Sequence, residues 1–106
     1  MKSVLIALLL SVSASSFAQN CHDQVESYYQ QLNYERNYDD EGISTQPVEI
    51  EEVRSEYGNL DFDTAEPSNF AIYFGHSSSW GGYGVDALIY EKATCEVVAV
   101  EEIYAE

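Results

Sequence analysis

Three hydrophobic patterns follow one another along the chain. Residues 4–10 form an unbroken apolar run, and residues 21–36 carry apolar side chains at helical spacing. Much of the chain after residue 47 alternates between apolar and polar side chains, as strands do. The pattern predicts a short apolar segment, then one helix, then several strands.

The helix is predicted over residues 21–36. At about 100° per residue, one sector collects Cys21, Val25, Tyr28, Tyr29, Leu32 and Arg36. Tyr34 points the opposite way, and Asn20 is placed to cap the start. This face is apolar apart from Arg36, whose charged head we expect to reach solvent.

A polar loop at residues 37–42 and an edge strand are predicted next. Pro47 can begin that strand, in which Val48 and Ile50 share one face. Residues 54–68 are polar and contain turn signals, so we expect an irregular segment there.

The second half of the chain predicts a sheet. A strong strand begins at Phe70, and residues 85–91 and 96–104 form a hairpin. Residues 75–84, rich in glycine and serine, are expected to be a loop. The fold is therefore predicted to be α+β, with one N-terminal helix packed on an antiparallel sheet of three to four strands in two layers.

The first 18 residues are predicted to be a secretory signal peptide. Lys2 supplies a positive start, the apolar run is too short to span a bilayer, and Ser16 and Ala18 fill the −3 and −1 positions of a cleavage site. Cleavage after Ala18 removes 18 of the 106 residues and leaves a single domain of 88, residues 19–106. The mature protein is expected to be periplasmic or secreted.

The charge of the chain narrows the choice of partner. There are 19 acidic residues and four basic ones; without Lys2, three basic against 19 acidic residues give a net charge of −16. Such a surface repels nucleic acid and anionic lipid, so we expect no nucleic-acid partner and no membrane insertion after signal cleavage. Such a surface favours a cationic partner or divalent cations. The alternative is a solvated acidic surface without a specific partner.

Cys21 and Cys95 are expected to form a structural disulfide. They are the only cysteines, and export would place them in an oxidising compartment. A metal-thiolate or redox pair is disfavoured because there is no C-x-x-C spacing and only two histidines could complete a metal site. Closing a loop of 74 residues is worth about 4 kcal/mol in the loop-entropy model.

In plan the chain is similar to the small periplasmic YebF and colicin M immunity proteins. The resemblance covers Cys21, the helix stretch Tyr28-Tyr29-Gln30-Gln31, and residues 87–104 around Cys95. It implies a signal peptide, an N-terminal helix with a cysteine, and a second cysteine late in the sheet. It is a likeness of architecture, and no functional residue is carried over.

No catalytic residue is assigned. His76 stands beside serines, and Asp86 follows, but the G-x-S-x-G elbow is missing and adjacent loop residues rarely form a triad. A solvent-exposed loop is the favoured interpretation, so the protein is expected not to be an enzyme and to need no cofactor.

Metal binding is a weak prediction. Asn59, Asp61, Asp63 and Glu66 place oxygen ligands at near-alternate positions, as calcium loops do. The glycine and the twelfth-position acid of an EF-hand are missing. His22 and Glu26, four apart on the helix, would suit one edge of a zinc site that lacks an evident third ligand.

The stretch 75–84 carries the candidate partner-binding residues His76, Trp80 and Tyr83. Aromatic side chains between glycines and serines are typical of recognition surfaces. Trp80, the only tryptophan, is equally compatible with folding back as a cap on the core.

These observations give one leading hypothesis of function and one main alternative. The first is an exported, non-enzymatic binding or inhibitor domain for a protein partner, with a cationic partner favoured by charge complementarity. The alternative is a calcium- or glycan-binding accessory domain of the periplasm. A small hydrolase ranks below both.

Processing can be tested by mass. Intact-mass measurement of the exported protein should show the loss of residues 1–18 and a mass two hydrogens below that of the dithiol form. A mature chain that keeps these residues, or that carries two free thiols, would contradict the export argument.

Overall fold

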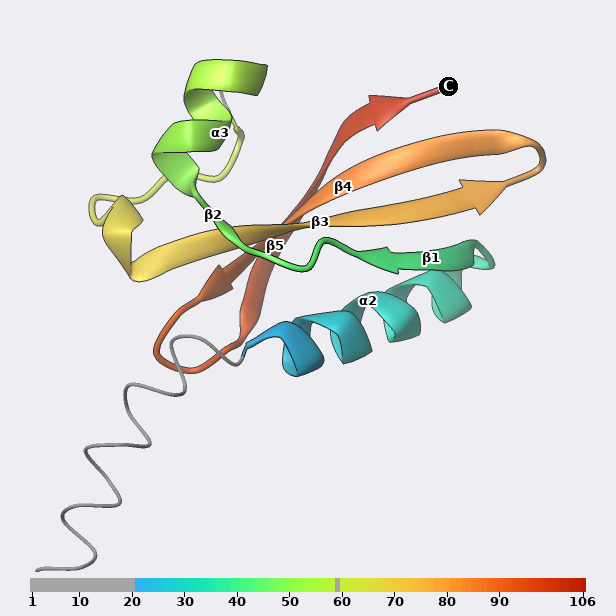
Figure 1. Ribbon diagram of the computed structural model, residues 1–106, viewed down its shortest axis with the longest axis horizontal. Coiled ribbons are helices and arrows are strands. Elements are labelled where there is room, and N and C mark those ends of the chain that lie inside the picture. Colours follow the sequence, from blue (N-terminus) through green and yellow to red (C-terminus); the bar gives the residue numbers. More distant parts are fainter. Residues whose placement is uncertain (1–20, 59) are drawn as a thin grey trace, which may run out of the picture.

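The computed structural model describes residues 21–58 and 60–106 (Figure 1). In chain order the elements are α2 (His22–Arg36), β1 (Asp39–Ile43), β2 (Val48–Glu49), α3 (Ile50–Tyr57), the 3-10 turn η1 (Pro67–Asn69), β3 (Phe70–Ser79), β4 (Gly82–Glu91) and β5 (Val97–Ala105). The predicted signal peptide and the Asn20 cap lie outside the described residues. Within that part of the chain, no helix has both the length and the apolar character needed to cross a membrane.

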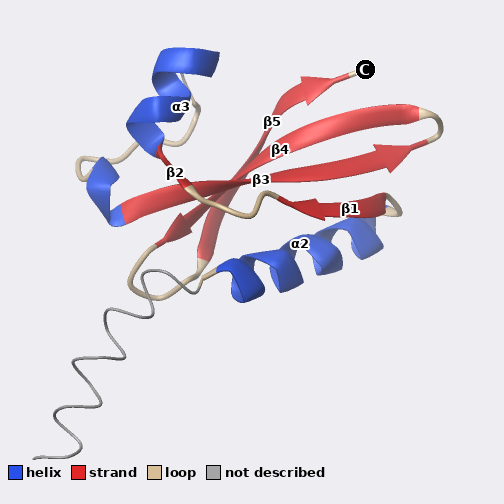
Figure 2. Cartoon of the chain, viewed as in Figure 1, coloured by secondary structure: helices blue, strands red, loops and turns tan. Residues whose placement is uncertain are grey.

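The five strands form one antiparallel sheet in the order β1-β3-β4-β5, with β2 also paired to β3. Helix α2 runs along one face of this sheet (Figure 2). The prediction of an α+β fold with a helix on an antiparallel sheet is therefore confirmed. The strand number exceeds the expected three to four because β1 and β2 pair with successive parts of the same β3 edge.

Helix α2 buries its apolar face against the middle of the sheet. Val25 and Tyr29 of α2, with Cys21 just before the helix, are fully buried. They belong to one core with Ala71, Tyr73, Leu88, Tyr90 and Cys95. Tyr28 is 43% exposed, contrary to the prediction, because the buried face turns toward Asn33, which is 1% exposed. Tyr34 is exposed as expected.

The C-terminus of α2 is closed by local backbone bonds. Asn37 adopts the left-handed conformation (φ 63°), and its N–H reaches the carbonyls of Asn33 and Tyr34. The Tyr38 N–H also bonds the Asn33 carbonyl at 2.8 Å, which is the pattern of a Schellman cap. The helix therefore ends firmly at Arg36, with Asn37 as its cap.

The polar loop predicted at residues 37–42 is wrong. Asp39–Ile43 forms β1, paired to the outer part of β3, with a register shift beside Gly42 at φ +93°. An edge strand pairs through its backbone, so its polar side chains can stay in water. Side-chain alternation therefore gave no sign of this strand.

The other face of the sheet carries a second core beneath α3, where the sequence predicted a strand through Ile50 and then an irregular segment. The edge strand is present as β2 but covers only Val48–Glu49, and Ile50–Tyr57 forms α3 instead. The irregular segment is confirmed only in part, because residues 60–66 have no helix or strand whereas residues 54–57 belong to α3. Ile50 and Val53 lie three positions apart, which places them on one helical face. They pack on Ile72, Ala87 and Ile89.

The Cys21–Cys95 disulfide is confirmed. It joins the start of α2 to the residues that lead into β5, with the two Cα atoms 5.0 Å apart. Cys21 is fully buried and Cys95 is 6% exposed, so the bond lies inside the first core. It fixes the point on the sheet from which α2 starts.

Replacing both Cys21 and Cys95 with serine should lower the free energy of unfolding by about 4 kcal/mol, because the unfolded chain regains the freedom of the closed loop. Urea unfolding under non-oxidising conditions measures the change. The parent protein with dithiothreitol is the control and should lose as much. A double variant within about 0.5 kcal/mol of the oxidised parent would contradict a structural role for the bond.

Candidate functional site

The far end of the β3–β4 hairpin is the candidate site. The two strands pair without interruption from Phe70 opposite Glu91 to Ser79 opposite Gly82. Trp80 and Gly81 form the turn, with φ +50° and +78°. Positive φ at both central residues is the mark of a type I′ turn, whose twist matches that of the flanking strands.

The flexible loop predicted at residues 75–84 is therefore wrong. Glycine and serine have low strand propensity, but backbone pairing with the facing strand overrides it here. Gly75 has a packing role, because a Cβ at this position would lie 2.5 Å from the Tyr29 ring. The glycine that suggested a loop instead lets α2 approach the sheet.

Trp80 is fully exposed, at 103% of its reference area. Of the two interpretations of this residue, the core cap is therefore wrong. A bulky side chain at positive φ is also a conformational outlier, since such turns favour asparagine or glycine. The chain thus presents its one tryptophan at the tip of an ordered hairpin, on a strained backbone.

His76 and Tyr83 lie close to this tip. Both belong to the sheet face opposite α2, where the His76 Nδ1 and the Tyr83 hydroxyl share a hydrogen bond. The Tyr83 ring packs edge-on against Tyr104 of β5 at 6.3 Å, and Tyr104 is 49% exposed. The three residues predicted for partner binding thus gather at one end, joined by Tyr104, which the sequence analysis did not single out.

A polar cluster lies on the sheet face that carries α2, beneath the C-terminal end of that helix. Arg36 pairs with Asp86 at 2.8 Å, and the Tyr29 hydroxyl donates to the same carboxylate oxygen at 2.7 Å. The Asp86 side chain is only 7% exposed. The Arg36 side chain stays 27% exposed, but its head turns onto Asp86 instead of extending into solvent as expected, because the buried carboxylate needs a counter-charge.

Further contacts hold the Arg36 guanidinium in place. Its Nε donates to Asn33 at 2.8 Å, and the group lies over the Tyr38 ring, 4.4 Å from the centroid. Burial opposes its charge, but the hydrogen bond and the charge of Asp86 outweigh burial and raise the pKa of Arg36.

The Tyr29 hydroxyl stays protonated in this cluster. Burial raises the pKa of Tyr29 to about 12, a hydrogen bond with Ser77 works in the opposite direction, and the hydrogen bond to Asp86 adds to the rise. The neutral hydroxyl can therefore keep donating to Asp86 well into the alkaline range.

The residues considered for catalysis do not converge. Ser77 and Asp86 belong to the sheet face that carries α2, whereas His76 belongs to the opposite face. Asp86 is held by Arg36, and His76 is bonded to Tyr83. A serine-histidine-carboxylate triad needs all three groups on one side.

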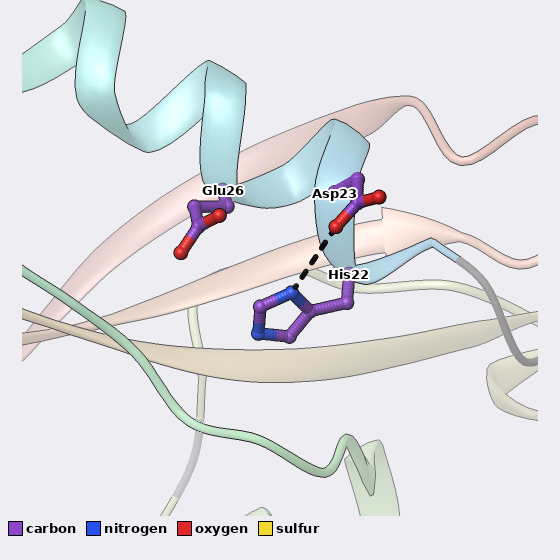
Figure 3. Close-up of side chains that lie close together, drawn as sticks. All are labelled: His22, Asp23 and Glu26. Atoms are coloured by element: carbon purple, nitrogen blue, oxygen red, sulfur yellow. Dashed lines mark ion pairs between the residues drawn. The ribbon is translucent and has the colours of Figure 1, made fainter.

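One group of potential metal ligands comes together at the start of α2. The ligand atoms of His22, Asp23 and Glu26 lie within 4.8 Å of one another, with the His22 Nδ1 3.7 Å from Asp23 (Figure 3). Asp23 supplies the third group that the sequence analysis lacked. The Asp23 side chain is 96% exposed. A carboxylate at the N-terminus of a helix also stabilises the helix through its dipole, without any bound metal.

Two of the calcium candidates, Asp63 and Glu66, have carboxylates that contact protein groups. Asp63 lies 3.9 Å from the Arg54 guanidinium, and Glu66 accepts a hydrogen bond from Asn69 at 2.6 Å. The Asp61 backbone N–H donates to Glu101. Asn59 lies outside the described residues, and calcium binding stays a prediction.

Comparison of the chain with family models, curated proteins and solved structures gave no match. The function is therefore argued from the hairpin end itself.

Raising the pH through the alkaline range should destabilise the fold. The Tyr29 pKa is 10.0 in the unfolded chain and about 12 in the folded protein, so its stabilisation is complete below pH 10 and is lost as the pH rises through 12. Thermal melts across this window should show a falling melting temperature. Tyr29→Phe should melt lower than the parent near neutral pH, yet lose less on alkalinisation. Equal alkaline slopes for both proteins would contradict the assignment.

Proposed function

We propose that the protein is an exported, non-enzymatic binding or inhibitor domain that recognises a protein partner through the end of the β3–β4 hairpin. The observation that carries the proposal is Trp80, fully exposed at a turn position where its backbone is strained. A side chain that neither packs nor suits its turn is best explained by a contact made outside the chain.

The rigidity of the hairpin favours this use. A partner that binds a flexible loop must offset the entropy of ordering it, whereas paired strands hold Trp80 in place beforehand. Tryptophan and tyrosine supply large, rigid contact areas and dominate the energetics of many interfaces. His76, Tyr83 and Tyr104 offer such an area beside the tip.

Charge favours a cationic partner. All three basic residues of the described chain are already paired internally: Arg36 with Asp86, Arg54 with Glu51, and Lys92 with Glu49. The remaining carboxylates give a strongly negative surface that would steer a basic protein toward it. Export is supported by the disulfide, which persists in oxidising compartments.

Changing Trp80 should separate binding from stability. Trp80→Ala should weaken partner binding by about 2 kcal/mol or more, the usual hot-spot threshold, and leave the free energy of unfolding within about 0.5 kcal/mol. Trp80→Asn should abolish the same contact while holding or raising the melting temperature, because asparagine suits a type I′ turn. Thermal melts and affinity capture from the exported fraction measure the two effects.

Tyr34→Ala is the matched control, since Tyr34 is an exposed aromatic on the outer side of α2. A supporting result is a protein captured by the parent and by this control but lost with both Trp80 variants. Capture that survives Trp80→Asn, or a large loss of stability in Trp80→Ala, would contradict the proposal.

A further inference from the structure

A pocket lies on the α2 side of the hairpin, just past the end of the helix. Its volume is about 140 Å³, and its walls include Tyr38, Ser77, Gly84 and Glu102. Helix α2 ends at Arg36, whereas β3 and β4 run on to the turn, so the helix leaves this part of the sheet uncovered.

Small residues keep the pocket open. Ser77, Ser79, Gly82 and Gly84 occupy the positions of β3 and β4 that face this side. A Cβ on Gly84 would meet only the Tyr104 carbonyl at 3.6 Å and the Ser77 hydroxyl at 3.9 Å, which are ordinary contacts. A larger side chain at Gly84 would therefore be tolerated by the backbone and would fill the space.

The size of the pocket limits what can enter. Sites for small organic ligands start at about 300 Å³. A cavity of about 140 Å³ is less than half of that and suits one side chain of a larger molecule.

The charge of the pocket selects a cation. Asp86 is matched by Arg36, but Glu102, paired opposite Asp86 in the ladder, also lines the pocket. Glu106 lines it too, but its carboxylate accepts a hydrogen bond from the Tyr104 hydroxyl. Each arginine and lysine in the described residues is paired with another carboxylate, so none of them neutralises Glu102. Hydroxyls of Ser77 and Ser79 add further acceptors.

The contacts of the adjacent Arg36 show which groups bind a guanidinium at this end of the sheet. That group is held between a carboxylate, Asp86, and an aromatic face, Tyr38, which also borders the pocket. A second cation entering from outside would meet the same combination of Tyr38 with a carboxylate, now that of Glu102. Carboxylate pairing and cation–π attraction both favour an arginine or lysine.

From this geometry we infer that the pocket receives one arginine or lysine side chain of the protein partner, beside the Trp80 anchor. The inference rests on the proposed function and adds the chemistry of the partner. Ser79 and Gly82 flank the turn and also line the pocket, so a single basic loop or strand can engage both features. The partner surface would then present a basic side chain next to a cleft for tryptophan.

The pocket can be tested without the partner. The peptide acetyl-Gly-Arg-Gly-amide, titrated into isotope-labelled protein, should shift the amide signals of Gly82, Gly84 and Glu102. The same peptide with citrulline in place of arginine has nearly the same shape but no charge, and should leave them unmoved. Equal shifts with both peptides, or shifts confined to other regions, would overturn the inference, as would a response to calcium with none to the arginine peptide.

Two variants locate the binding. Gly84→Val should remove the response by filling the pocket, and Glu102→Gln should weaken it about two- to fivefold, as expected for one exposed ion pair. Glu52→Gln, on the exposed side of α3, is the charge-matched control and should change nothing. A response unchanged in Gly84→Val that still folds would overturn the inference.

The two proposals fail separately. If capture of the partner depends on Trp80 but is unaffected by Gly84→Val and Glu102→Gln, the proposed function stands and the pocket inference falls. If the arginine peptide binds as described but no captured protein depends on Trp80, the pocket stands as a cation site and the proposed function falls.

Discussion

The difference in length between helix α2 and the hairpin beneath it determines most of this structure. A 15-residue helix is about 22 Å long, whereas ten-residue strands reach about 33 Å. The Cys21–Cys95 bond fixes one end of the helix at the base of the sheet, so its other end stops near Ser77 and Asp86. The last part of the hairpin is left without a helix above it.

The polar cluster at the end of α2 follows from the same limit. Where the apolar contact between helix and sheet ends, Arg36 turns back over the sheet and closes the core with Asp86 and Tyr29. A buried pair of this kind contributes little net stability compared with apolar packing, but losing one partner leaves an uncompensated charge. Its main effect is therefore to fix where the helix lies.

The sequence predicted those elements in which side-chain burial and backbone structure agree. Apolar side chains at regular spacing predicted the buried face of α2 and the start of β3. The presence of only two cysteines predicted the disulfide. Helix α3 was missed because Val48 and Ile50 alternate like a strand, although the Ile50–Val53 spacing and Gly58 at its end were signs of a short helix. Strand β1 and the outer hairpin are held by backbone pairing, which side-chain patterns do not report.

The candidate site was only partly predictable for the same reason. His76, Trp80 and Tyr83 could be singled out because aromatics stand out among glycines and serines. Tyr104 and Glu102 come from β5 and join them only through strand register, which a single sequence does not specify. The inward turn of Arg36 depends on Asp86, 50 residues away.

Strand β5 forms the outer edge of the described sheet, and its irregularity bears on how the protein behaves in concentrated solution. The ladder to β4 is interrupted where Val98 and Ile103 are each an extra residue, so this edge lacks a long regular row of free backbone groups. An antiparallel pairing of two copies along β5, centred on Glu101 and Glu102, would also bring these like charges together. Bulges and like charges at an edge oppose amyloid-like stacking. The β5 edge therefore resists the edge-to-edge aggregation to which an open sheet is prone.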